Sequence, residues 1–139
     1  MKHVLEHVGA DFATFAAVMR KLYQVLTPDG LLEIHVPHLR HESFWSDPTH
    51  VRAFTPMTFQ MMSKRQNEIW MEQGANYTML AVIMGVEFKV EEIVQIYMPK
   101  WQAKVDAGEM AKAELRDKAE RNWNVAKELQ VRLRAVKDG

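Results

Sequence analysis

The sequence contains no cysteine, and this absence excludes several kinds of site. Without thiols, the chain has no disulfide framework, no thiolate metal ligand and no cysteine nucleophile. Charge of one sign is also lacking, because 18 Lys and Arg residues balance 18 Asp and Glu residues. A balanced chain carries no electrostatic signature of nucleic-acid or anionic-membrane binding. We therefore expect a cytoplasmic protein without a nucleic-acid partner.

Long hydrophobic runs are missing as well. No apolar run approaches the ~20 residues that cross a membrane, and no apolar stretch follows Lys2 as it would in a signal peptide. We expect no membrane partner. Glycine is scarce, and the six glycines form no Gly-x-Gly cluster. Hydrophobic residues still make up 47% of the 139 residues, which is enough to pack the core of one domain.

The clearest pattern is a helix followed by a strand. Asp11 is a typical helix N-cap, and apolar residues then recur at spacings of three and four as far as Leu26. Residues 27–30, Thr-Pro-Asp-Gly, predict a turn. From Leu31 to Val36 apolar and polar residues alternate, as they do in a strand. Such αβ units favour a parallel sheet in an α/β fold.

The remaining segments predict a loop, further strands and a long helix. Residues 37–54 form a long polar connection, which is often functional. A helix is expected from Thr55-Pro56 to about Gln66, and one or two strands within 77–97. Residues 109–137 lack Gly and Pro, and a heptad-like seam from Leu115 to Val136 predicts one long helix. We thus divide the chain into an α/β part, 1–100, and a charged helical part, 101–139.

Three segments together resemble class I S-adenosylmethionine-dependent methyltransferases. Residues 3–8, His-Val-Leu-Glu-His-Val, resemble the end of that fold's fourth strand. Residues 22–36 resemble its helix, Pro-Gly-Gly turn and fifth strand, with Asp29 in place of the first glycine. Residues 47–56 are similar to a motif of a bacterial subset of the family. The resemblance implies a partial Rossmann-like sheet, from strands four and five onward, and methyl transfer from S-adenosyl-L-methionine to an unknown acceptor.

The resemblance also implies roles for particular residues. At the end of the fourth strand, Glu6 and His7 would position the acceptor or take its proton, and His3 and Leu5 would contact the cofactor. The 37–54 loop would cover the substrate, and its candidate residues are His38, Asp47, His50 and Arg52. We expect Asp47 and Arg52 to brace this loop through a charge-assisted hydrogen bond. Phe44, Trp45 and Phe54 are expected to form a small satellite core beneath it.

The family's cofactor-binding features have no counterpart here. A glycine-rich turn after the first strand and an acidic residue after the second normally hold the cofactor. We therefore expect an incomplete methyltransferase that binds the cofactor weakly by itself and needs a completing N-terminal half. The alternative is a non-catalytic interaction module. An unpaired edge at Leu31–Val36, or the seam of the long helix, would then produce a homo-oligomer.

The histidines of the loop region raise the question of a metal site. His35, His38, His41 and His50 lie near Glu42 and Asp47 in the sequence, and all six side chains are potential ligands. Their spacing does not match a helical His-x3-His pair, and no cysteine assists them. We therefore expect solvated polar residues and no metal ion.

Overall fold

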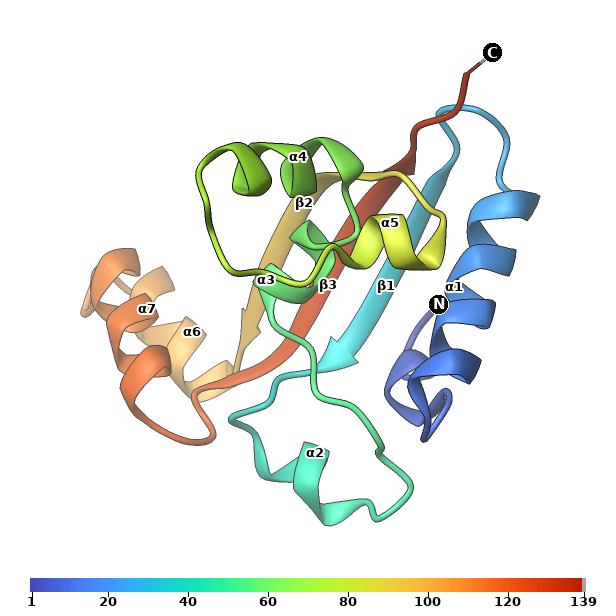
Figure 1. The fold of residues 1–139 in the computed structure, drawn as a ribbon. Coiled ribbons are helices and arrows are strands. Elements are labelled where there is room, and N and C mark those ends of the chain that lie inside the picture. Colours follow the sequence, from blue (N-terminus) through green and yellow to red (C-terminus); the bar gives the residue numbers. More distant parts are fainter. Residues whose placement is uncertain (139) are drawn as a thin grey trace.

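The computed structural model describes residues 1–138, which form an α/β fold around an antiparallel sheet. The sheet contains β1 (Leu31–Pro37), β2 (Phe88–Tyr97) and β3 (Ala126–Ala135), in the order β1-β3-β2. Strand β3 is antiparallel to both neighbours, so β1 and β2 run in the same direction (Figure 1). The α/β class is confirmed, whereas the hydrogen-bonded strand pairs are antiparallel rather than parallel.

Helix α1 (Phe12–Val25) and strand β1 form as their patterns predict. The Asp11 carboxylate accepts a hydrogen bond of 2.8 Å from the Thr14 backbone N–H, which caps the helix. The turn before β1 places Asp29 in the left-handed region, with φ of 60°. The helix buries Phe15, Ala16 and Met19 against the sheet's apolar face.

The middle of the chain is more helical than expected. Two helices replace the single helix predicted from Thr55: α3 (Pro56–Gln60) and α4 (Lys64–Glu72). The chain breaks between them because Ser63 acts as the N-cap of α4. The region 77–97 holds α5 (Leu80–Met84) before its one strand, β2. The remaining helices are α2 (Glu42–Ser46), α6 (Pro99–Asp106) and α7 (Lys112–Arg121). Within residues 1–138, no helix combines the length and apolarity needed to cross a membrane.

The predicted long C-terminal helix is wrong. Helix α7 ends at Arg121, Asn124 turns the chain with φ of 59°, and β3 follows as the central strand. Leu129 and Leu133, assigned to a helical seam, are instead buried in the main core. The C-terminal region therefore completes the sheet of the preceding residues, and the seam that was to drive oligomerisation does not exist.

Alternation along β3 gives the sheet one apolar and one polar face. Leu129, Val131 and Leu133 are each at most 1% exposed and face the core beneath α1, α3 and α5. The residues between them, Gln130 and Arg132, are polar, and the next residue on that face, Arg134, donates from Nε to Glu91 Oε1 at 2.8 Å. An antiparallel sheet tolerates such a solvated face. A smaller cluster, Leu115, Ala119, Val125 and Ala126, packs α7 onto the start of β3.

The N-terminal segment touches the outer edge of β1 only briefly. A single parallel bridge joins Lys2 to His35, with His3 N–H donating to His35 O at 2.9 Å. The strand end predicted at residues 3–5 does not continue, because Leu5–His7 form a 3-10 helix, η1. The Met1 amino group also donates to Glu33 O at 2.8 Å, and Leu31 at the start of the strand is 48% exposed.

Candidate functional site

A cleft of about 480 Å³ lies at the carboxyl end of β1. In Figure 1, α2 and its flanking loop lie beyond the arrowhead of β1, on the same side as the N-terminal segment. Ligands of open α/β sheets bind at this end of the strands. The residues that line the cleft are polar or charged except for one proline: His3, Glu6, His7, Pro37, His41, Ser43, Asp47, His50, Lys127 and Glu128.

The loop is clamped onto the N-terminal segment by backbone hydrogen bonds. Val51 N–H donates to Glu6 O at 2.8 Å, and Arg52 Nη1 donates to Val8 O at 2.9 Å and Gly9 O at 3.0 Å. The guanidinium also lies 4.1 Å from the centre of the Phe15 ring. Burial lowers the pKa of Arg52, but a guanidinium remains charged at neutral pH. Arg52 therefore positions the loop.

Asp47 does not bind Arg52, so the expected brace between them is wrong. The Asp47 carboxylate accepts hydrogen bonds from the Thr49 hydroxyl at 2.6 Å and from the Thr49 N–H at 2.9 Å. These bonds lower the pKa of Asp47, so the carboxylate is ionised at neutral pH. The same hydroxyl lies 2.9 Å from His7 Nδ1. Asp47 thus fixes Thr49, and Thr49 fixes the ring of His7.

The carboxylate of Glu6 is buried, and within residues 1–138 it has no hydrogen-bond partner. The residue is 1% exposed, and neither carboxylate oxygen has a partner among the described residues. The nearest imidazole nitrogens are His7 Nε2 at 3.7 Å and His3 Nδ1 at 3.8 Å from Oε1, too far for hydrogen bonds. A buried carboxylate without a partner is costly to stability, which makes Glu6 the clearest candidate functional residue.

The side chain of His50, in the loop after α2, lies close to those of Glu6 and His7. Its Nδ1 lies 2.6 Å from Phe44 O, and its side chain is 8% exposed. The ring packs edge-on against His7, with centroids 4.6 Å apart. The satellite core predicted here is wrong in part. Phe44 packs against His50, but Phe54 belongs to the main core and Trp45 is 61% exposed.

The remaining predicted site residues have different positions. His3 lines the cleft, and its Nε2 lies 2.7 Å from Glu128 Oε1. Leu5 is fully buried in the main core and does not line the cleft. His38 is also buried, with Nδ1 accepting a 3.0 Å hydrogen bond from Arg40 N–H. Burial lowers the pKa of His38, so its imidazole is neutral at pH 7.

Sequence reasoning missed the contribution of β3 to this site. Lys127 and Glu128 come from the segment that was predicted as a helix. In the strand, Glu128 is opposite Pro37 of β1 and accepts a 2.9 Å hydrogen bond from Gln130 Nε2. The alternation from Leu129 to Ala135 was the available signal. His41 and Ser43 were also missed as lining residues, and they cap α2 through Ser43 N–H and His41 Nδ1.

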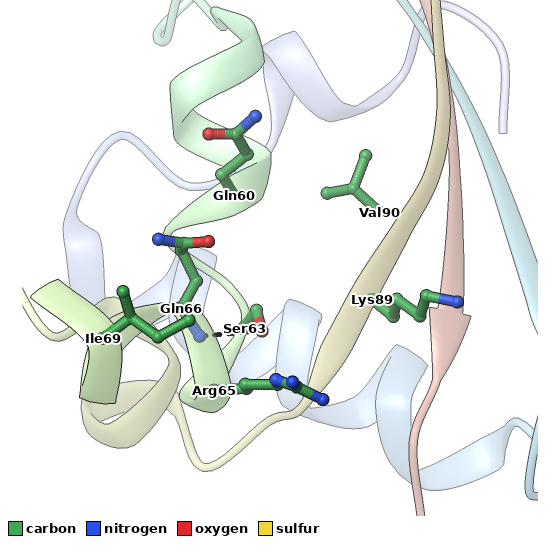
Figure 2. Close-up of a pocket in the computed structure, with 7 residues that line it drawn as sticks. All are labelled: Gln60, Ser63, Arg65, Gln66, Ile69, Lys89 and Val90. Atoms are coloured by element: carbon green, nitrogen blue, oxygen red, sulfur yellow. Dashed lines mark hydrogen bonds between the residues drawn. The ribbon is translucent and has the colours of Figure 1, made fainter.

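A second cleft, of about 300 Å³, lies between helices α3–α4 and strand β2 (Figure 2). Its lining residues are Gln60, Ser63, Arg65, Gln66, Ile69, Lys89 and Val90. They provide amides, a hydroxyl and two cations, but no carboxylate or imidazole. The first cleft, which has both carboxylates and imidazoles, is therefore better suited to acid–base chemistry or metal binding.

No protein-family model matches the chain, and a search of curated proteins finds no significant match. Any functional assignment therefore depends on the cleft and the fold themselves.

Proposed function

We propose that the chain forms the acceptor side of an S-adenosylmethionine-dependent methyltransferase site. The observation that carries the proposal is the position of Glu6 and His7. They lie in a cleft at the carboxyl end of β1, on a segment bridged in parallel to that strand. An acidic residue and a histidine at the end of the neighbouring strand are what the resemblance implied.

The strand arrangement supports the proposal independently of the sequence motifs. From the outer edge inward, the N-terminal segment, β1, β3 and β2 lie side by side, and only β3 is reversed. The parallel bridge between the N-terminal segment and β1 agrees with the adjacent fourth and fifth strands that the resemblance implies.

The chemistry of methyl transfer suits this cleft. Transfer requires mainly that nucleophile, methyl carbon and sulfur are held in line. A carboxylate or imidazole near the acceptor can orient a hydroxyl or amine and remove its proton. Glu6 Oε1 and His7 Nε2 lie 3.7 Å apart. The half-exposed ring of His7 can contact an acceptor in the cleft, whereas the buried carboxylate of Glu6 can act only beside that ring.

The residues of this chain do not make a cofactor cradle. Gly9 is needed for a close approach within the protein, since a Cβ there would lie 2.6 Å from Phe15 N, and the other glycines are scattered. Of the two cofactor residues predicted, His3 lines the cleft and Leu5 is in the core. The cofactor's ribose and adenine would be held by further strands on the outer side of the Met1–His3 segment, as a completing half or another chain would supply.

A direct test is calorimetric titration of S-adenosylhomocysteine into the natural polypeptide that contains this chain. We expect a micromolar dissociation constant there, and a much weaker one for residues 1–139 alone, because a one-sided site buries little ligand surface. Glu6→Gln and His7→Ala should leave this binding intact while reducing transfer from radiolabelled S-adenosylmethionine. Absence of binding by the natural polypeptide would refute the proposal.

The outer edge of β1 favours a second candidate, an interaction module. The N-terminal segment bonds its backbone at Glu33 O and at His35, and Leu31 at the start of the strand is 48% exposed. Such an edge can accept a strand from a partner or from another copy. Edge pairing without any S-adenosylhomocysteine binding would favour this candidate over catalysis.

A further inference from the structure

Three potential metal ligands converge in the cleft from two distant parts of the chain. The carboxylate of Glu6 and the imidazoles of His7 and His50 each place one ligand atom within 4.8 Å of the others. Glu6 and His7 belong to η1, whereas His50 belongs to the loop after α2. This set differs from the loop histidines that led us to expect no metal ion, and only His50 is common to both.

Hydrogen bonds assign the tautomer of His7. The Thr49 hydroxyl has one proton, and it donates that proton to the Asp47 carboxylate at 2.6 Å. At its 2.9 Å contact with His7 Nδ1, Thr49 must therefore accept. His7 is protonated at Nδ1, and the lone pair of Nε2 is free on the side of Glu6.

The tautomer of His50 follows from the same reasoning. Its Nδ1 lies 2.6 Å from the carbonyl oxygen of Phe44, which can only accept. In the neutral imidazole the proton is therefore on Nδ1 and the lone pair is on Nε2. The Asp47 carboxylate is 3.7 Å from Nε2, too far for a hydrogen bond. Metal-binding histidines commonly donate their other ring N–H to a carbonyl or to a carboxylate-linked group, which fixes ring orientation. His7 and His50 both make such a contact through Nδ1, to Thr49 and to Phe44 O respectively.

Glu6 supplies the observation that points to a cation. Both of its buried oxygens are without hydrogen-bond partners in the described part of the chain. Divalent cations compensate such carboxylates, and two imidazoles with one carboxylate form a common transition-metal ligand set. Tetrahedral bonds of about 2.0–2.2 Å place ligand atoms roughly 3.3–3.6 Å apart. The 3.7 Å between Glu6 Oε1 and His7 Nε2 is close to that separation.

We propose that Glu6, His7 Nε2 and His50 Nε2 bind one divalent transition-metal ion, such as Zn²⁺. Three protein ligands leave a fourth position for water or a substrate oxygen. All three residues line the cleft, and the side chain of His7 is 37% exposed there, so the fourth position would face the cleft. The proposal does not depend on methyl transfer.

The test is titration of Zn²⁺ into the untagged, chelator-treated 139-residue chain, followed by calorimetry. We expect one equivalent to bind with a dissociation constant of about 1 µM or tighter. Glu6→Gln and His50→Gln should each weaken binding by more than about 100-fold, and Thr49→Val by about 10–100-fold through loss of the second set of contacts. His41→Gln is the matched control, because His41 lines the same cleft outside the ligand set; its affinity should not change.

A spectroscopic measurement keeps the test valid if a variant fails to fold. In the unmodified chain, nitrogen NMR should show Zn²⁺ shifting the Nε2 resonances of His7 and His50 while both Nδ1 atoms stay protonated. The proposal is overturned if the unmodified chain binds no stoichiometric Zn²⁺, if these resonances do not move, or if folded Glu6→Gln and His50→Gln variants bind as tightly as the control. None of these readouts uses S-adenosylmethionine, so the two proposals fail separately.

Discussion

Replacing Leu133 with alanine tests whether the C-terminal region is the central strand of the sheet. Leu133 is fully buried in β3, opposite Leu32 of β1 on one side and Val90 of β2 on the other. The substitution removes three buried carbon atoms, worth about 0.8 kcal/mol each. A partly unfilled cavity adds about 1–2 kcal/mol. We expect the free energy of unfolding to fall by about 3–4 kcal/mol in total.

Val136→Ala is the matched control. Leu133 and Val136 both belong to the heptad seam of the predicted helix, so in a helix the two substitutions would cause similar losses of stability. In the structure Val136 follows the strand and is 41% exposed, and we expect a loss below about 1 kcal/mol.

The assay is urea unfolding followed by circular dichroism and tryptophan fluorescence. The melting temperature of Leu133→Ala should fall by more than about 10 °C, since each kcal/mol shifts it by about 4 °C at this size. A loss below about 1 kcal/mol for Leu133→Ala, or equal losses for both variants, would refute the central position of β3.

Three further predictions concern the residues around the cleft. Arg52→Lys should lower the free energy of unfolding by about 1–3 kcal/mol in urea titrations, because the shorter lysine cannot keep both carbonyl hydrogen bonds together with the packing of a planar guanidinium on Phe15. Gly9→Ala should destabilise more than Gly74→Ala by thermal melting: both have positive φ, but only at Gly9 does a Cβ meet backbone, 2.6 Å from Phe15 N. Burial lowers the pKa of folded His38, so the unfolded chain is protonated first as pH falls. Stability should therefore be complete above pH ~6.5 and decline below it, and His38→Asn should flatten that decline in unfolding curves measured across pH.

The first third of the fold could be predicted because its patterns have one interpretation. Apolar residues every three or four positions after Asp11 fit only a helix, and the turn before Leu31 separates it from an alternating strand. The segment from Leu129 to Ala135 was ambiguous. Leu129, Leu133 and Val136 fit a helical seam, whereas Val131 fits only the alternation of a strand. Long-range pairing with β1 and β2 decided between them.

The chemistry of the candidate site was only partly accessible from sequence. The segment of Glu6 and His7 and the segment of Asp47 to Arg52 were both recognised as candidates. The loop was expected to lie over the strand end, but the bonds that join the two were not foreseen, because Arg52 and Val8 are 44 positions apart. The opposite charges of Asp47 and Arg52, five positions apart, led us to predict a bond between them. In the structure Arg52 donates to backbone carbonyls instead.

The unpartnered carboxylate of Glu6 could act as a general base or as a metal ligand, and the two roles make different demands. A general base needs access to its acceptor and a nearby proton route, and Glu6 is 1% exposed. A metal ligand needs instead a fixed position, a negative charge and neighbouring lone pairs. In His7 and His50 the proton is on Nδ1, so Nε2 of each ring provides a lone pair. His7, which is 37% exposed at its side chain, is therefore the better candidate for direct contact with an acceptor when no ion is bound. With an ion bound, the acceptor would meet the metal's open position instead. Zn²⁺ affinity measured on Glu6→Gln decides between these arrangements, since a purely basic role for Glu6 predicts no dependence on the ion.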